Sequence, residues 1–282
     1  MRSIIAALLV CGFLISPIWS TEPTASLSRD EVLILLRDGN ARFVSENPQK
    51  WPEVAVTREH LATEGQHPFA CIVTCSDSRV PPEVLFDRSL GDLFVIRLAG
   101  NVMTPEAAAS VEYAVEHLRV TVVVVLGHTG CGAVKAALTG RHEEIKGPMS
   151  TLLSRIYPAV DAARMKGFGG EELYQATINE NARMSAEQLL RDSRVIDEAV
   201  SRGYLTVLSA VYDLHSGTIR WQHQLMAAVT PVTPPPVMPQ AEAVPAPTKN
   251  ADAAVKTDTQ AAKTKPKTKA AQADTDYAKR HR

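Results

Sequence analysis

Two short segments of the chain combine side chains that bind metals or move protons. The first is Cys75-Ser76-Asp77-Ser78-Arg79, and the second is Gly127-His128-Thr129-Gly130-Cys131-Gly132. The thiolates of Cys75 and Cys131 with the imidazole of His128 are a natural ligand set for Zn²⁺, which prefers a tetrahedral arrangement of sulfur and nitrogen. Three protein ligands leave a fourth position for water, as in catalytic zinc sites. The sequence therefore predicts a catalytic zinc site if the two segments meet.

Asp77 lies beside this ligand set and has two uses. Its carboxylate is the nearest additional ligand for a metal, and it is also an acceptor that can stand behind a bound water. Arg79 is permanently charged and can hold Asp77 ionised through a bidentate pair. Because a carboxylate paired with Arg79 cannot ligate the metal at the same time, the two residues form a natural two-state element.

Each of these residues also has a plainer structural interpretation. Two cysteines outside the cytoplasm often form a disulfide. His128 can be a hydrogen-bonded core histidine, and Asp77 with Arg79 can be an ordinary salt bridge. Together, these interpretations require two reactive segments to stand at two strand ends by coincidence, so we favour a shared site.

Each segment directly follows a short apolar run that predicts a buried β-strand. Residues 69–74 precede the first segment, and the β-branched run at 121–126 precedes the second. Functional residues gather at the carboxyl ends of parallel strands. If the two strands are neighbours, Cys75, His128 and Cys131 converge at one edge of the sheet.

The remaining patterns predict that strands alternate with helices along the chain. A capping box at Ser28 and Glu31 opens the first helix. Cys71 lies inside an apolar run and is expected to be a buried, inert thiol. Further strands are expected at 92–97, 205–211 and 218–221, and further helices at 105–118, 130–138, 149–164 and 171–202. The alternation predicts an α/β domain with a mainly parallel β-sheet flanked by helices and with an antiparallel edge strand.

Composition places the chain among ordinary globular proteins. Of its 282 residues, 45% are hydrophobic and 22% are charged, and the formal net charge is −1. This balance argues against a strongly basic nucleic-acid binder, so no nucleic-acid partner is expected. Four cysteines are too few for a disulfide scaffold of this length. One folded domain is expected at residues 27–228.

The two ends of the chain lie outside that expected domain. Residues 1–20 combine a positive start, an apolar run and a small residue at a cleavage site, a pattern typical of a signal peptide. They predict a periplasmic or secreted protein.

Residues 229–282 are rich in proline, alanine and lysine and lack apolar periodicity, so a disordered tail is expected. From residue 231 onward, nine Lys/Arg stand against five Asp/Glu, and this net charge of +4 favours weak contact with anionic lipid or envelope polymer.

The two reactive segments carry a family resemblance. Cys-x-Asp-Ser-Arg, followed about fifty residues later by His-x-x-Cys, resembles the pattern of the β-class carbonic anhydrases. The resemblance covers roughly residues 27–224. Further stretches that look like this family are Val80-Pro81-Pro82-Glu83, Gly91-Asp92-Leu93-Phe94-Val95-Ile96-Arg97, Ala99-Gly100-Asn101, residues 127–133, and Tyr212-Asp213-Leu214 with Gly217.

The resemblance implies a function and a role for each site residue. Cys75, His128 and Cys131 would be the ligands of Zn²⁺, and Asp77 with Arg79 would be the catalytic dyad. The reaction would be the reversible hydration of carbon dioxide to bicarbonate and a proton. The family also implies a dimer interlocked through N-terminal helices, with dimers pairing further, so a homodimer or homotetramer is expected. Family members also show a closed state. In that state the equivalent of Asp77 binds the metal and excludes the water.

Two other functions remain open at this point. The same zinc site can act on a sulfur analogue such as carbonyl sulfide or carbon disulfide, because these molecules are also linear and apolar. Alternatively, the chain is a non-catalytic zinc or redox protein of the envelope. That alternative requires a fourth permanent ligand or a disulfide between Cys75 and Cys131.

Overall fold

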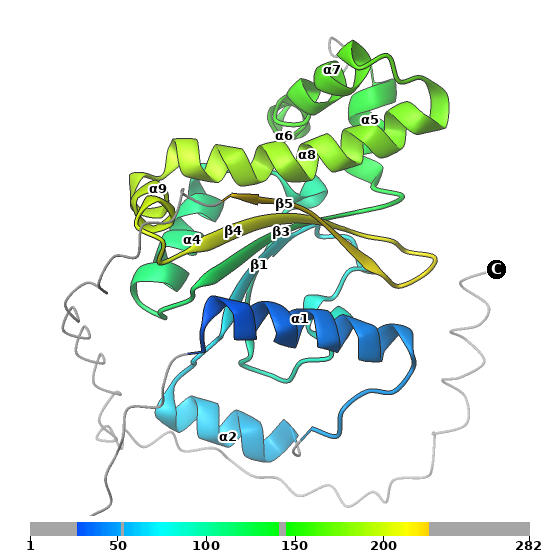
Figure 1. Ribbon diagram of the computed structural model, residues 1–282. Coiled ribbons are helices and arrows are strands. Elements are labelled where there is room, and N and C mark those ends of the chain that lie inside the picture. Colours follow the sequence, from blue (N-terminus) through cyan, green and yellow to red (C-terminus); the bar gives the residue numbers. More distant parts are fainter. Residues whose placement is uncertain (1–26, 52–53, 141–144, 226–282) are drawn as a thin grey trace, which may run out of the picture. The chain divides into compact units, whose positions relative to one another are not determined.

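A five-stranded β-sheet organises the protein, and its strand order is β2-β1-β3-β4-β5 (Figure 1). The computed structural model describes residues 27–51, 54–140 and 145–225. β1 to β4 run parallel to one another, and β5 is antiparallel to β4. The predicted fold class, with its antiparallel edge, is therefore confirmed. The strands are β1 (Ala70–Thr74), β2 (Leu93–Arg97), β3 (Val122–His128), β4 (Thr206–Tyr212) and β5 (Ile219–Leu225).

β1 and β3 are neighbouring parallel strands in the middle of the sheet. Their register pairs Cys71 with Val123 and Thr74 with Leu126. The Thr74 hydroxyl also donates to the Leu126 carbonyl at 2.8 Å. Every residue of both strands is buried, as expected for apolar runs covered on both faces. Because the two strands are neighbours and run in the same direction, their carboxyl ends open at one edge of the sheet.

Nine α-helices and one short 3₁₀-helix accompany the sheet in the described part of the chain. The capping box predicted at Ser28 and Glu31 is present and begins the first helix. The helices are α1 (Arg29–Val44), α2 (Val54–Glu64), α3 (Pro82–Leu85), η1 (Ala99–Asn101), α4 (Pro105–Glu116), α5 (Gly132–Thr139), α6 (Pro148–Ser154), α7 (Tyr157–Met165), α8 (Gly170–Asp192) and α9 (Arg194–Ser201).

Two long helices that the sequence predicts are each divided in the structure. The segment at 149–164 forms α6 and α7, and Pro158 stands in the first turn of α7, where its missing N–H costs no helical hydrogen bond. The segment at 171–202 divides at Ser193, whose side chain accepts a hydrogen bond from the Ile196 N–H and caps α9. In both cases the apolar periodicity continues across a local break.

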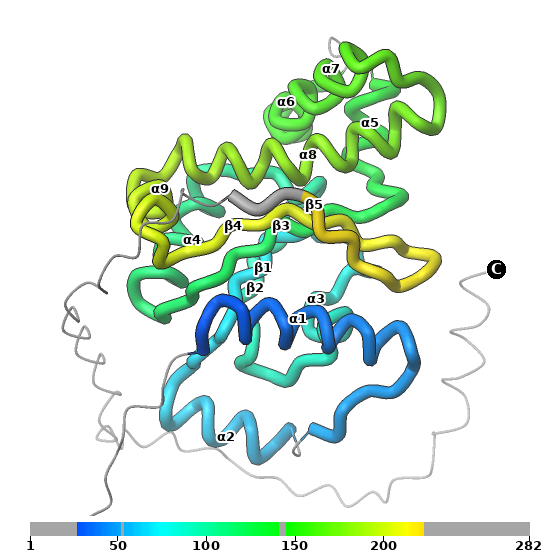
Figure 2. Tube along the Cα trace, in the orientation of Figure 1, coloured from blue at the N-terminus to red at the C-terminus, as the bar shows by residue number. Residues whose placement is uncertain are grey.

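Helices cover both faces of the sheet (Figure 2). α1 packs on one face through side chains such as Leu36, which join a cluster with Ile72 of β1. α4, the C-terminal part of α8, and α9 cover the other face, where Cys71 and Val73 lie. Cys71 is fully buried, and burial raises the pKa of its thiol, in agreement with the expected inert thiol. The alternation of β1 residues between the two faces follows the two-residue period of a strand.

The predicted signal peptide at 1–20 and the whole of the predicted tail at 229–282 lie outside the described residues, which exclude 1–26 and 226–282. The domain boundaries at 27–228 therefore stay a prediction. Among the described helices, none combines the length and the apolar character needed to cross a bilayer.

Candidate metal centre

Cys75, His128 and Cys131 converge in the structure. Their side-chain ligand atoms all lie within 4.8 Å of one another, and all three residues are buried. Cys75 directly follows β1, His128 is the last residue of β3, and Cys131 directly precedes α5. The convergence predicted from the two strand ends is therefore confirmed.

Two loops carry the site. The first loop is residues 75–79, and the second loop is residues 128–132. In the second loop, Gly130 adopts a φ of +69°, a left-handed conformation that glycine reaches without steric cost. This turn brings Cys131 back toward His128, so that both side chains face the end of β1.

The imidazole of His128 is oriented for a metal. Its Nδ1 lies 2.9 Å from the Thr129 carbonyl oxygen, so this nitrogen carries the ring hydrogen and donates it. Nε2 therefore presents its lone pair. It is buried and has no hydrogen-bond partner among the described residues. A buried nitrogen with a free lone pair beside two thiols fits a metal with sulfur and nitrogen ligands.

The two thiols interact strongly with each other. Hydrogen bonding from Cys131 lowers the pKa of Cys75, although burial acts in the opposite direction. Hydrogen bonding to Cys75 and burial raise the pKa of Cys131. The backbone N–H of Gly100 also donates to Cys75 Sγ at 3.2 Å. A bound divalent cation would favour the thiolate form of both cysteines, because metal ligands must be deprotonated.

Asp77 and Arg79 form a bidentate ion pair beside this group. Arg79 Nε donates to Oδ1 at 2.9 Å and Nη2 donates to Oδ2 at 2.7 Å. The Arg79 side chain lowers the pKa of Asp77 to about 2. Asp77 Oδ2 lies 3.9 Å from His128 Nε2. Of the two arrangements expected for Asp77, the structure has the one in which the carboxylate is paired with Arg79.

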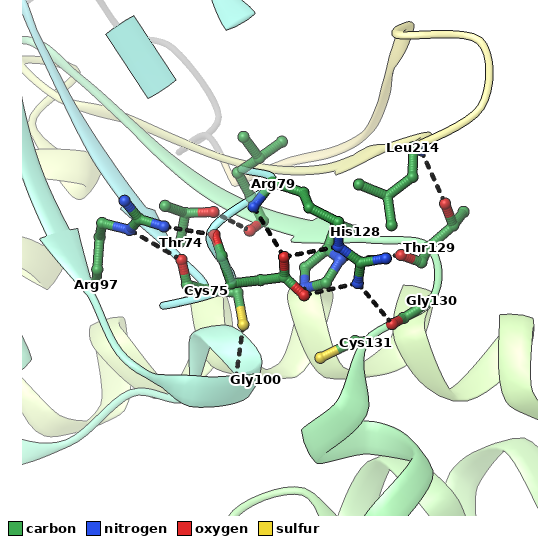
Figure 3. A network of polar contacts seen from close by, with 12 residues as sticks. Thr74, Cys75, Arg79, Arg97, Gly100, His128, Thr129, Gly130, Cys131 and Leu214 are labelled. Carbon is green, nitrogen blue, oxygen red and sulfur yellow. Dashed lines mark hydrogen bonds and ion pairs between the residues drawn. The ribbon is translucent and has the colours of Figure 1, made fainter. Parts of the chain in front are cut away.

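Further residues support the site although the sequence alone assigns them no role in it. Arg97 Nε donates to the Cys75 carbonyl at 3.1 Å, and Arg97 Nη2 donates to the Asp77 carbonyl at 2.5 Å (Figure 3). The Tyr174 hydroxyl donates to the Cys131 carbonyl at 2.8 Å. These contacts join residues that are 20 to 43 positions apart. For Arg97 the sequence offers two signals, its position at the end of a predicted strand and its place in the family-like stretch at 91–97, but neither assigns it a contact.

The chain resembles known proteins over the region that builds this site. The family model described as carbonic anhydrase matches residues 70–219. A carbonic anhydrase of Mycolicibacterium smegmatis is 37% identical over 193 residues, which cover 67% of this chain and 91% of that protein. Carbonic anhydrase 2 of Mycobacterium tuberculosis is 37% identical over 185 residues, covering 64% of this chain and 87% of its own.

Solved structures give the same result. A β-carbonic anhydrase of Aspergillus fumigatus is 32% identical with a TM-score of 0.53, and the match covers 60% of this chain and 82% of that one. A tetrameric β-carbonic anhydrase of Sordaria macrospora is 28% identical with a TM-score of 0.52, and the match covers 59% and 88%. With its convergent cysteine and histidine side chains and these relatives, the chain belongs to the β-class carbonic anhydrase family, whose activity is the hydration of carbon dioxide.

Proposed function

We propose that Zn²⁺ is the metal of this carbonic anhydrase, with Cys75, His128 and Cys131 as its ligands and Asp77 with Arg79 as the catalytic dyad. The observation that carries the proposal is the buried Nε2 of His128, which has no hydrogen-bond partner among the described residues. It lies between two thiols and an ion-paired carboxylate. Two sulfurs and one imidazole favour zinc over Mg²⁺ or Ca²⁺, which prefer oxygen ligands.

The chain supplies an oriented acceptor next to the metal position. When bound, zinc would act as a Lewis acid that makes water a nucleophile near neutral pH. Because the pKa of Asp77 is about 2, its carboxylate is ionised at neutral pH. The ionised Asp77 carboxylate would accept a hydrogen bond from the activated water. This hydrogen bond would direct a lone pair of the water oxygen toward carbon dioxide. Orientation of this kind contributes to the rate because it is present before the reaction begins.

Arg79 keeps Asp77 in that role. The Arg79 guanidinium donates one hydrogen bond to each carboxylate oxygen of Asp77. The Arg79 backbone N–H donates a third, to Oδ1 at 2.9 Å. Arg79 Nη2 also reaches the Gly130 carbonyl of the second loop at 3.4 Å. Ligation of a metal by Asp77 would break the bidentate pair, so the pair favours a site with an open coordination position.

Stopped-flow hydration of carbon dioxide by the zinc-loaded protein tests the proposal, together with a count of bound zinc. We expect activity with one zinc per chain in the parent, and loss of both zinc and activity in Cys75→Ser. Full zinc occupancy in Cys75→Ser would remove Cys75 from the ligand set. Release of hydrogen sulfide from carbonyl sulfide or carbon disulfide, without activity on carbon dioxide, would assign the same site to the sulfur analogues.

We propose further that copies of the chain assemble into a homodimer or homotetramer. α2 buries none of its side chains in the single chain, and Val54 and Val56 are 70% and 61% exposed. Light scattering during gel filtration tests this. The double substitution Val54→Asp and Val56→Asp is expected to dissociate the assembly, whereas Met165→Asp on α7, which is 90% exposed, is the matched control. A monomeric parent protein would contradict the proposal.

Periplasmic or secreted localisation is a proposal that rests on residues 1–20 alone. Weak contact with anionic lipid or envelope polymer rests likewise on the lysine-rich tail. Mass spectrometry of the mature protein from a Gram-negative host is expected to give a chain that begins after residue 20. Retention of Met1 on cytoplasmic protein would contradict the localisation.

A further inference from the structure

Helix α8 contacts the metal centre at two points, and the mechanism above uses neither. The helix crosses one face of the sheet and packs on β3 and β4 (Figure 1). Tyr174, in its first turns, donates from its hydroxyl to the Cys131 carbonyl at 2.8 Å. Asn181 donates from Nδ2 to the Gly100 carbonyl at 2.7 Å. Seven residues separate the two side chains, which is close to two helical turns, so they lie on the same face of α8.

Each contact leads directly to one of the two sulfur ligands. Cys131 is the ligand whose own carbonyl Tyr174 holds. Gly100, whose carbonyl Asn181 holds, donates its N–H to Cys75 Sγ at 3.2 Å. One helix face therefore supports both cysteines, one through its backbone and the other through a single intervening residue.

The surroundings give Asn181 little freedom. Its side chain is buried, with 1% of the residue exposed. Gly100 has a φ of +69°, and a Cβ placed on it would lie 2.8 Å from Ile156 Cδ1 and 3.1 Å from the Ala133 Cβ. Gly100 is thus tightly enclosed, and the amide of Asn181 is the group that fixes its carbonyl. With its Cα enclosed and its carbonyl held, Gly100 donates its N–H to Cys75 Sγ from a restrained position.

We propose that Tyr174 and Asn181 are positioning residues that set how tightly this site holds its metal. The inference rests on the proposed metal site. Groups that hydrogen-bond to the ligands of a metal, or to the backbone beside them, orient those ligands and typically change metal affinity by about 10- to 100-fold when removed. Asn181 has the larger effect, because the Cys131 carbonyl also accepts the Lys135 N–H at 3.0 Å and stays partnered without Tyr174.

The rate of zinc transfer to a chromogenic chelator in excess measures this without any assay of activity. Tyr174→Phe removes only the hydroxyl, and Asn181→Leu removes the amide at similar volume. We expect release to accelerate several-fold in Tyr174→Phe and by about 10-fold or more in Asn181→Leu. In the cobalt-substituted protein, the thiolate-to-cobalt charge-transfer band is expected to shift in both variants, which a merely structural role would not cause.

Thr177→Val is the matched control on the same helix. Thr177 is as deeply buried as Asn181, but its hydroxyl donates to the Leu173 carbonyl within α8 itself. This variant is expected to release zinc at the parent rate with an unchanged cobalt spectrum. Thermal melting of the metal-free proteins separates a folding defect from a change at the site, and Tyr174→Phe serves as the decisive variant if Asn181→Leu does not fold.

The outcomes distinguish this inference from the proposed function. If the parent binds zinc and hydrates carbon dioxide, but Tyr174→Phe and the folded Asn181→Leu release zinc at the parent rate, the positioning role is overturned alone. If the parent binds no zinc at all, the proposed metal site fails and this inference fails with it.

Discussion

The first and second loops carry the same site, but different interactions hold them. The first loop is fixed largely by charged groups: Arg97 binds two of its carbonyls, and Arg79 binds the Asp77 carboxylate. The second loop is held mainly by neutral contacts, namely the glycine turn at Gly130 and the hydrogen bond from Tyr174. The first loop is also more open to solvent. The charged pair of the proposed site thus lies on the more exposed loop, whereas the second loop carries two of the three buried residues proposed as ligands.

This comparison predicts that substitutions in the first loop can separate catalysis from metal binding. Arg79→Ala leaves Asp77 without its cationic partner but close to the metal, so Asp77 is expected to occupy the fourth position. Asp77→Asn keeps that position open but removes the charged acceptor. In both variants zinc stays bound and carbon dioxide hydration falls by about 10²-fold or more, the scale for losing one preorganised polar group.

Stopped-flow rates with zinc counts on the same samples measure both quantities. Near-parent rates in both variants, with zinc retained, would reduce the dyad to a structural salt bridge. Loss of zinc in both would mean that the first loop cannot be altered without disturbing the ligands, and the contrast between the loops would fail.

Gly130→Ala tests the second loop through its backbone. A side chain at a φ of +69° costs about 1–2 kcal/mol, and the new Cβ would lie 3.2 Å from Leu214 Cδ1. We expect lower stability and faster zinc release, measured by urea unfolding and chelator competition. Gly65→Ala is the control, because Gly65 has a φ of +84° with nothing within 4 Å. Equal zinc release by the two variants would contradict a role for the turn in placing Cys131.

Acid unfolding of the metal-free protein tests the charge on the first loop. The pKa of Asp77 in the folded chain is about 2, below its ordinary value of 3.8. Ionised Asp77 therefore stabilises the fold above pH 3.8, and this contribution is lost as the pH falls through about 2. The difference in unfolding free energy between the parent and Asp77→Asn is expected to be constant near neutral pH and to shrink across this window. A difference that does not change with pH would contradict the assignment.

Removal of residues 231–282 is expected to have the smallest effect. The segment has no apolar pattern that could contribute to a core, so we expect neither loop to depend on it. The shortened protein is expected to keep its hydration rate and to unfold within about 0.5 kcal/mol of the parent. A large loss in either measurement would make the tail a part of the enzyme.

The sequence predicts the site better than its surroundings, for physical reasons. The sequence predicts β1 and β3 because buried parallel strands are continuous apolar runs. It predicts the candidate ligands at their ends because cysteine and histidine are rare. α2 was not predicted, since it buries no face in the single chain and has no amphipathic pattern to read. The contacts of Arg97 and Tyr174 depend on tertiary packing between distant segments, which local patterns do not contain.

The parallel pairing of β1 with β3 has a consequence for folding. Thr74 and Leu126, which the hydrogen bond from the Thr74 hydroxyl joins at the strand ends, are 52 residues apart in the chain. The proposed ligand group therefore assembles only when this non-local pairing has formed, a step that requires the closure of a long loop. A cation that recognises the assembled group binds the native state more tightly than the unfolded chain, so it shifts the folding equilibrium by mass action. The melting temperature of the protein should rise with the concentration of free zinc, and a chain exported unfolded would acquire its final stability only in the compartment that supplies the metal.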